Sequence, residues 1–263
     1  MAEKFKRLPE QQHNAVLAAA QRPDHLIPGI EDGFVPKHVI FNKRTLVSVH
    51  RAGFGDMRPS AYFDRQGSYE DSAASLFLTQ AGRAYARQFG VPCQRRRVVV
   101  LQCGDKKAEP SWEKYHYRGV IPAGQLYIGP YHRSLRLTAS ALTNPFLTWI
   151  MSAWHGLIPL KRPLGRYNVK LGDPKAITPE KMRRHTASLD LADADVIFLG
   201  SKGYADLFTE SVPHAFTPLS GDLLAQRSQC KTVRENPDLM REWWDAAALG
   251  RGRCLEPDEG CPK

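Results

Sequence analysis

The chain has 263 residues, of which 42% are hydrophobic and 24% are charged, and this ordinary globular composition argues against wholesale disorder. The formal charge of +10 favours a polyanionic partner, with nucleic acid ahead of an anionic membrane surface, over the alternative of a basic enzyme without such a partner. Because no run of 18 apolar residues occurs and the N-terminal residues lack the apolar core of a secretory signal, we expect a cytoplasmic protein with no membrane partner.

The cysteines also favour a cytoplasmic protein. Their number is odd and their spacing irregular, which favours reduced cytosolic thiols over a disulfide framework. No CxxC pair is present, so we expect neither a metal site nor a cofactor. The five positions are Cys93, Cys103, Cys230, Cys254 and Cys261.

The first region of the chain, residues 1–93, begins with helical patterns. Residues 8–22 start with a proline at a plausible first helical position and continue in alanine-rich sequence, which predicts a helix. Residues 35–44 predict a second, short helix, because two valines lie one turn apart on the same face. The alternation of apolar and polar residues over 45–50 then predicts a strand.

A polar, glycine-containing stretch follows, and residues 76–90 predict a strand that runs directly into a helix. Thr79 is a suitable N-cap for that helix, and Gly90 is a suitable stop. The order helix, helix, strand, long ribbon, strand, helix resembles the winged helix-turn-helix domains of many bacterial proteins over residues 8–90.

This resemblance implies a DNA-binding domain. In that family the second helix of the pair enters the major groove and the wing contacts the DNA backbone. The alternative is a solvated basic helix in a domain that contacts only protein. The resemblance assigns Lys37, Asn42, Lys43 and Arg44 to the groove-binding helix, and Arg51, Arg58 and Arg65 to the wing.

Charge is distributed in agreement with this assignment. Residues 1–97 hold 15 basic and 9 acidic residues, whereas the remainder holds 22 and 18. The excess of positive charge is therefore denser in the N-terminal region, where contact with phosphates would need it. The basic segment 92–97 separates the two regions, and we expect a second domain over 94–263.

The second region alternates between apolar runs and helical patterns. Residues 98–103, 146–153 and 194–200 are apolar runs of the kind found in strands covered on both faces. Helical patterns occupy the segments between and after them. This alternation predicts an α/β fold, a mostly parallel sheet with helices on both faces. All three runs end in polar, glycine-containing loops, and ligands of such sheets bind beyond the carboxyl ends of the strands.

The motifs in this region also resemble a known family. "LQCGDKK", "AGQLYIGPYHRSLRLTASAL", "WIMSAWHGLIP", "LGRYNVKL" and "PLSGDLLAQR" follow, over residues 98–230, the order and spacing of an uncharacterised bacterial domain family. That family is related to the peroxide-stress protein YaaA and to the core of archaeosine synthase, and more distantly to the uracil-DNA glycosylase fold. The motif positions carried over are Cys103, Lys107, Tyr127, Ser152, His155, Gly156 and Tyr167.

Two positions depart from the family pattern. Trp154 stands where the family usually has lysine, and Asn168 stands where it usually has aspartate. The first change adds a flat stacking surface. The second removes a carboxylate, which puts in doubt any mechanism that needs a general base at that position.

The resemblance implies chemistry on a nucleobase, because the related families mostly handle modified nucleobases or nucleic acid. Together with a basic N-terminal domain, it predicts a DNA glycosylase for a modified or damaged base, including bases found in phage DNA, with a role in defence or repair. Its partner would be double-stranded DNA with the modified base flipped out. Such an enzyme needs a donor for the charge that develops on the departing base, an acceptor that orients water, and an aromatic face for the flipped base.

Candidate residues for these tasks follow the strand ends. We expect Asp105 or Asn168 to position water, and His155 to donate to the leaving base, because imidazole retains an N–H in either protonation state. The other candidates are aromatic faces (Tyr127, Trp154, Tyr167), cations for flanking phosphates (Lys106, Lys107, Lys202), and the remaining strand-end positions (Cys103, Gly104, Ser152, Gly156).

Each candidate has a structural alternative. Asp105 is equally suited to capping a helix or pairing with a lysine, and His155 to a hydrogen bond with backbone in a turn. Trp154 is as suited to packing as to stacking. A cysteine that closes a buried strand, as Cys103 does, is most often a small core residue.

Two rival functions stay open at this stage. One is a transferase or lyase that modifies a nucleobase without cleaving the glycosidic bond, as the archaeosine synthase resemblance implies. The other is a DNA-binding regulator whose α/β domain senses a nucleotide-like ligand.

Overall fold

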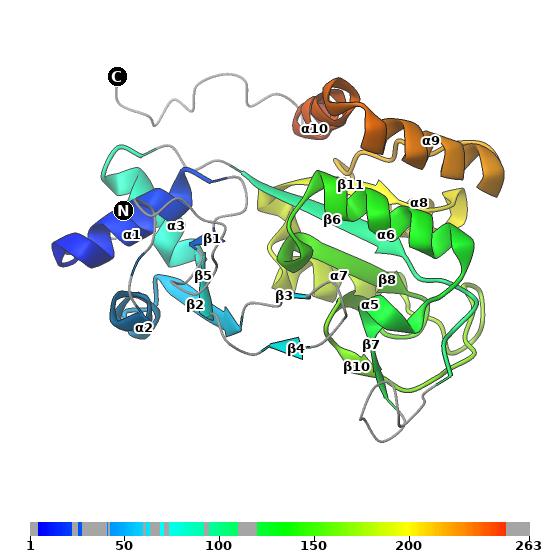
Figure 1. Ribbon diagram of the computed structural model, residues 1–263, viewed down its shortest axis with the longest axis horizontal. Helices are drawn as coiled ribbons and strands as arrows, with labels where there is room; N and C mark the ends of the chain where they lie inside the picture. The colour runs from blue at the N-terminus through cyan, green and yellow to red at the C-terminus, as the bar shows by residue number, and fades with distance from the viewer. Residues whose placement is uncertain are drawn as a thin grey trace. The chain divides into compact units, whose positions relative to one another are not determined.

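The computed structural model describes residues 5–22, 26–27, 41, 43–59, 62–63, 69–70, 74–91, 95–109 and 120–250 (Figure 1). The chain divides into two compact units, Met1–Arg96 and Arg97–Pro262. They are called unit 1 and unit 2 below, and each is described by itself. The division falls three residues beyond the boundary expected after Cys93.

Unit 1 contains a three-stranded antiparallel sheet with helices packed against it. The strand order is β1-β5-β2, so the last strand in sequence lies in the centre. A second, two-stranded pair joins β3 and β4. The elements are α1 (Glu10–Ala20), β1 (Leu26–Ile27), α2 (Lys43–Arg51), β2 (Gly55–Pro59), β3 (Tyr62–Phe63), β4 (Tyr69–Glu70), β5 (Ala74–Leu78) and α3 (Gln80–Gln88).

The core of unit 1 forms around Tyr85 of α3, which is fully buried. Its hydroxyl group accepts a hydrogen bond from the backbone N–H of Leu8 at 2.8 Å and lies 2.8 Å from Nδ1 of His13. Alanines and a valine on one face of α1 pack with Leu46 of α2 against the same cluster. The phenol thus buries its ring while its polar end is satisfied, as a buried tyrosine requires.

Two sequence predictions for unit 1 have different outcomes. The predicted strand over 45–50 is wrong, because these residues belong to α2. Leu46 and Val49 are buried three positions apart, which is the spacing of one helical face and not of a strand. The predicted N-cap is confirmed, since Thr79 Oγ1 accepts from the N–H of Gly82 at 3.1 Å.

Because residues 45–50 are helical, some of the residues expected to contact DNA lie in other elements than predicted. Lys43 and Arg44 begin α2, whereas Arg51, expected in the wing, is its last residue. Arg58 lies in β2. The other expected contacts, Lys37, Asn42 and Arg65, lie outside the described residues.

Unit 2 is built on a four-stranded sheet with the order β11-β6-β8-β9. The strands are β6 (Arg96–Gln102), β8 (Thr148–Ser152), β9 (Gly156–Pro159) and β11 (Ala194–Leu199), and a separate pair joins β7 (Ile121–Pro122) to β10 (Pro163–Leu164). Strands β6 and β8 are parallel, and β9 returns antiparallel to β8 as a hairpin. The expected α/β class with a mostly parallel sheet is confirmed.

Helices cover both faces of this sheet. Val99 and Leu101 on one face pack in a core with residues from three helices: α6 (Pro130–Leu142), α9 (Leu223–Glu235) and α10 (Pro237–Gly250). On the other face Phe198 stacks on Phe208 of α8 (Lys202–Thr209), with ring centroids 5.0 Å apart. Successive residues of a strand point to opposite faces, so the continuous apolar runs reflect burial on two sides.

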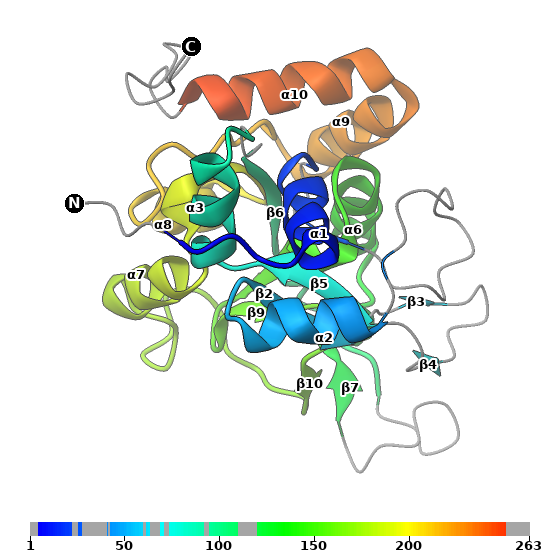
Figure 2. The same ribbon diagram turned by 90° about the vertical axis from the view of Figure 1, so that its left-hand side faces the viewer.

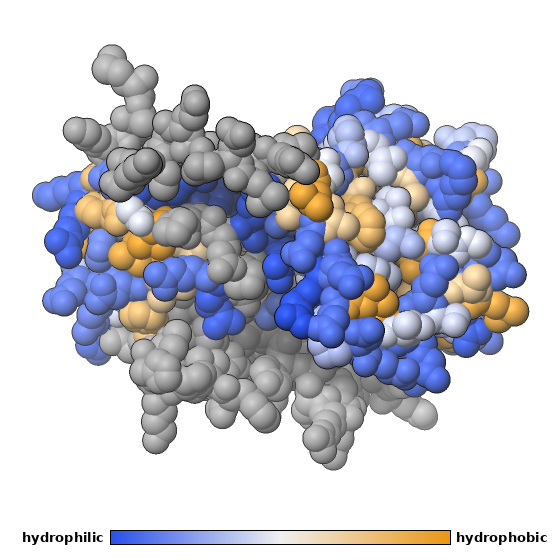
Figure 3. Space-filling view, turned by 90° about the horizontal axis from the view of Figure 1, so that it is seen from above, coloured by the Kyte–Doolittle hydropathy of each residue, from blue (hydrophilic) through white to orange (hydrophobic). Residues whose placement is uncertain are grey.

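The remaining helices of unit 2 lie at its edges. The short α5 (Ala123–Leu126) precedes α6, and α7 (Pro179–Ser188) contacts β9. α9 and α10 lie side by side in both ribbon views (Figures 1 and 2). Viewed from above Figure 1, hydrophobic residues over unit 2 are interspersed with hydrophilic ones (Figure 3). In the described part of the chain, no helix combines the length and apolarity that a bilayer crossing needs.

Candidate functional site

The carboxyl ends of three strands meet at one edge of the unit 2 sheet. The N–H of Cys103, directly after β6, donates to the carbonyl of Met151 in β8 at 3.0 Å. The N–H of Ser201, two residues after β11, donates to Oε1 of Gln102 at 2.7 Å. The ends of β6 and β11 therefore adjoin, which makes these strands parallel and brings together the three loops that the sequence singled out.

Three hydroxyl groups form a chain at this edge, which we call the hydroxyl chain: Ser152, Tyr167 and Tyr127. Ser152 Oγ lies 2.8 Å from the Tyr167 hydroxyl, which lies 2.6 Å from that of Tyr127. Ser152 Oγ also accepts the backbone N–H groups of Trp154 and His155, at 3.1 and 3.0 Å. These two bonds occupy both of its lone pairs, so its own proton is donated to Tyr167.

Burial separates this chain from solvent. Ser152 is fully buried, and Tyr127 and Tyr167 are 2% and 8% exposed. Burial raises the pKa of both phenols well above the ordinary value, so both are neutral at physiological pH. The rings of both tyrosines, which the sequence analysis expected to stack on a base, are part of the hydrophobic core.

Trp154 is an exposed aromatic residue of the site. Its indole is 41% exposed and stacks on the imidazole of His155, with centroids 4.8 Å apart and planes 28° apart. The His155 ring in turn meets the Tyr167 ring edge-to-face at 5.1 Å. Partial burial lowers the pKa of His155, and the positive charges of Arg162 and Lys181 lower it further. His155 is thus a neutral imidazole beside an exposed indole.

Ile177 and His185 pack against the turn that carries these two rings and hold it in place. Gly156 closes it with a φ of +75°, and a Cβ there would lie 2.4 Å from Ile177 and 2.6 Å from Nδ1 of His185. That same Nδ1 accepts the N–H of Leu157 at 3.1 Å. The glycine identified in the sequence is therefore required both by the left-handed backbone and by close packing.

Lys107 lies over the faces of the two buried tyrosines. Its Nζ is 4.4 Å from the Tyr167 ring centroid and 5.8 Å from that of Tyr127, and it donates to the backbone oxygen of Asp105 at 3.3 Å. Partial burial lowers the pKa of this amine, as do the charges of Arg166 and Lys170, while Cys103 and Asp105 act in the opposite direction. Lys107 is held in place by aromatic faces and a carbonyl group.

Sequence reasoning did not identify two residues of the site. Tyr204 of α8 places its hydroxyl 3.4 Å from Sγ of Cys103, which is itself buried. His132 of α6 is also buried, and its Nδ1–H donates to the carbonyl of Gln102 at 2.8 Å. The signal for Tyr204 was its place in "SKGY" after the third strand. His132 sits in an ordinary helical pattern that carries no such signal.

The polar candidates on the rim are less constrained. Asp105, Lys106 and Asn168 are exposed. The Asp105 carboxylate lies close enough to raise the pKa values of Lys107 and Tyr204.

Two further candidates differ in their surroundings. Gly104 is buried, and a Cβ there would lie 3.1 Å from both His132 and Tyr127, so the close approach of the first loop depends on it. Lys202, expected to hold a phosphate, forms an exposed (i, i+4) ion pair with Asp206 at 2.8 Å. Its ammonium group is thus directed to its own helix.

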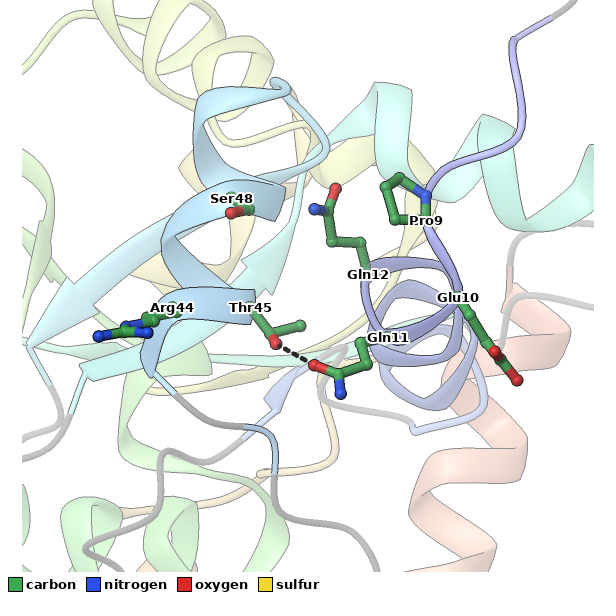
Figure 4. Close-up of a pocket in the computed structure, with 7 residues that line it drawn as sticks. All are labelled: Pro9, Glu10, Gln11, Gln12, Arg44, Thr45 and Ser48. Carbon is green, nitrogen blue, oxygen red and sulfur yellow. Dashed lines mark hydrogen bonds between the residues drawn. The ribbon is translucent and has the colours of Figure 1, made fainter.

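Unit 1 has a cavity between α1 and α2. It is open to solvent, has a volume of about 390 Å³, and is lined by Pro9, by residues 10–12 of α1, and by Arg44, Thr45 and Ser48 of α2. Thr45 donates to Oε1 of Gln11 at 3.1 Å across it, and the Arg44 side chain points away from α1 (Figure 4). The outward direction of Arg44 leaves its guanidinium available to a ligand outside the cavity.

No family model, curated protein or solved structure matches the chain. Within the described ranges, no group of three His, Cys, Asp or Glu side chains is arranged to hold a metal ion. Interpretation of the site therefore depends on its own geometry: an exposed indole and a neutral imidazole, beside a half-buried lysine and an exposed carboxylate at the edge of a parallel sheet.

Proposed function

We propose that the protein is a DNA glycosylase that hydrolyses the N-glycosidic bond of a modified or damaged base, with bases of phage DNA as one substrate class. The observation that carries the proposal is the Trp154–His155 stack at the sheet edge, where a flat exposed surface adjoins a neutral N–H donor. A nucleobase flipped from DNA needs both, because it must be stacked and its departing nitrogen must be stabilised.

The proposed mechanism assigns one task to each accessible group. The base stacks on Trp154, and the N–H of His155 donates to the negative charge that develops on the leaving base. Asp105, exposed on the loop after β6, orients the attacking water. The hydroxyl chain supports the site from below, since Ser152 fixes the backbone N–H groups of Trp154 and His155.

Unit 1 supplies the proposed DNA-binding surface, now centred on α2. Arg44, Ser48 and Arg51 occur at i, i+4 and i+7 and so share one face, opposite the buried Leu46 and Val49. The antiparallel sheet order β1-β5-β2, with α2 preceding β2, supports a winged-helix arrangement in which α2 enters the major groove. Both arginines are exposed and available to phosphates or base edges.

The test uses the full chain and a panel of duplexes that carry unmodified, damaged and phage-type modified bases. Released base is identified by mass spectrometry, and abasic sites are detected by strand scission after alkali. Release of one free base with matching abasic DNA is the expected result. Unchanged DNA across the whole panel would contradict the proposal.

Variants separate catalysis from binding. Asp105→Asn and His155→Gln are expected to lower the rate of base release at least about a hundredfold, the usual contribution of a positioned acid, base or oxyanion donor. Asp206→Asn, which removes an exposed carboxylate of the same unit, is the matched control and should leave the rate unchanged. DNA affinity should be the same in all three variants.

The rival functions give different products. A base-modifying transferase would need a small co-substrate and would leave no abasic site. A DNA-binding regulator would bind DNA in all three variants and form no product.

A further inference from the structure

We infer that Lys107 is a nucleophile that forms an imine with C1′ of an abasic sugar and thereby cleaves the DNA strand. The inference rests on the proposed function, since base release generates the abasic sugar at this site. It deepens that function by adding a strand-cleaving step to base removal.

The surroundings of Lys107 differ from those of a phosphate-binding lysine. Its amine lies over two phenol rings and donates to one backbone carbonyl, and it forms no ion pair with a carboxylate of the described residues. Lys202, by contrast, is paired with Asp206 in water. A phosphate-binding lysine must carry its positive charge, whereas an amine nucleophile must be neutral, and partial burial favours the neutral form.

The charged groups around Lys107 act in both directions. Arg166 and Lys170 favour the neutral amine, and Asp105 favours the ammonium form, as does Cys103 when ionised. Tyr127 and Tyr167, which lie beneath the amine, are neutral at physiological pH and contribute no charge. Burial is the largest influence, and it also favours the neutral amine.

The position of Lys107 fits the reaction. It lies on the loop after β6, two residues beyond Asp105. Its amine and the Trp154–His155 stack both contact the Tyr167 ring. Lys107 Nζ lies 4.4 Å from the centroid of that ring, and the centroid of the His155 ring lies 5.1 Å from it. A base stacked on Trp154 would therefore leave its sugar within reach of the same edge.

The step balances without an oxidant or reductant. The neutral amine adds to the C1′ aldehyde of the ring-opened sugar, and uptake of one proton from the solvent followed by loss of water gives an iminium ion. Water then takes a proton from C2′, the C3′–O bond breaks, and the 3′ phosphate leaves with the electron pair. A second water hydrolyses the conjugated imine, which restores the amine and leaves an unsaturated aldehyde on the upstream strand.

The test starts from DNA that already contains an abasic site, so that it does not depend on base release. The full chain is incubated with this DNA and sodium borohydride, which reduces the imine to a stable amine. The expected result is a covalent protein–DNA adduct that peptide mass spectrometry maps to Lys107, and strand cleavage without alkali when borohydride is omitted. Lys107→Arg should lower both signals at least about tenfold, whereas Lys170→Arg, the matched control, should lower neither.

The outcomes distinguish the two proposals. An adduct at another lysine, or an unchanged adduct in Lys107→Arg, would overturn the inference. Base release without any adduct or spontaneous cleavage would also overturn it while leaving the glycosylase proposal intact. An adduct at Lys107 with no base released from any duplex would support the inference and contradict the glycosylase. Circular dichroism of Lys107→Arg establishes that the variant is folded.

Discussion

The hydroxyl group of Tyr167 is hydrogen-bonded to those of Ser152 and Tyr127, which are buried from water. Tyr167→Phe would leave the hydroxyls of Ser152 and Tyr127 without this partner, and an unsatisfied buried hydroxyl costs about 1–3 kcal/mol. We expect the free energy of unfolding of unit 2 to fall by that amount. Tryptophan fluorescence in urea measures it selectively, because all five tryptophans belong to residues 97–262.

Tyr204→Phe is the matched control for this variant. The Tyr204 hydroxyl lies 3.4 Å from Sγ of Cys103, and sulfur is a weak hydrogen-bonding partner. We expect a loss of less than about 1 kcal/mol. Equal losses in the two variants would show that the hydroxyl chain contributes nothing beyond ordinary packing.

His132 predicts how stability depends on pH. Burial lowers its pKa to about 4, because protonation would place an N–H at Nε2, which has no partner within the described residues. The unfolded chain takes up a proton near pH 6.5, before the folded chain does. The contribution of neutral His132 to the free energy of unfolding is therefore fully present above about pH 6.5. It is lost as the pH drops towards 4, by up to about 3 kcal/mol.

Urea unfolding at several pH values between 7 and 4 checks this dependence. His132→Asn keeps a side-chain donor for the Gln102 carbonyl but has no titratable group, so its stability should fall less over the same range. A variant that loses stability as steeply as the wild type would exclude His132 as the cause.

Individual site residues were predictable from sequence where they ended an apolar strand. Cys103 and Ser152 close two runs, and the structure brings both to the same edge. Tyr204 and His132 were not predictable, because each lies on a helix and reaches the site only through packing between distant segments. The exposure of Trp154 and the burial of Tyr127 likewise depend on tertiary contacts that composition does not encode.

Among the elements, the β8–β9 hairpin is the one whose turn carries the accessible rings. Gly156→Ala would combine a left-handed backbone with a Cβ only 2.4 Å from Ile177. Gly172→Ala, at a φ of +94° with open space around it, would impose backbone strain alone. We expect a loss of about 1 kcal/mol for Gly172→Ala and at least about 2 kcal/mol for Gly156→Ala.

Tryptophan fluorescence in urea again measures both variants. The difference between them isolates the cost of displacing α7 from the turn. If both lost the same stability, the packing of Ile177 and His185 against the turn would be unimportant.

The elements also differ in how far sequence could predict them. The apolar strands β6, β8 and β11 were predictable, because burial on both faces removes any need for alternation. Helix α2 was mistaken for a strand because Leu46, Val47 and Val49 suit either structure, and only packing against α1 decides between them. β9 was not predicted, since the residues after β8 were interpreted as a polar, glycine-containing loop that ends the strand.

At the scale of the whole molecule, the arginines proposed to bind DNA and the proposed chemistry belong to different units. Arg44→Ala and Arg51→Ala should each weaken binding of duplex DNA and lower the slope of log affinity against log salt by about one. Fluorescence anisotropy at several salt concentrations measures the slope. Arg87→Ala, which removes the same charge from an exposed position on α3, should leave the slope unchanged.

The same arginine variants separate the units in function. Base release from a short single strand should be nearly unaffected, because groove recognition requires a duplex. A loss of release on single strands equal to that on duplexes would mean that α2 takes part in the chemistry.

The contacts that His185 and Ile177 make with the Trp154 turn have a consequence for ligand binding. Helix α7 holds the turn through His185, and the segment before it holds the turn through the N–H of Ile177, which donates to the Ala153 carbonyl at 2.6 Å. Local fraying of α7 must therefore release the aromatic platform, so that a molecule seated there and an intact α7 stabilise each other. Slower deuterium uptake at the Leu157 and Ile177 amides would then register occupancy of the platform, even before any bond is broken.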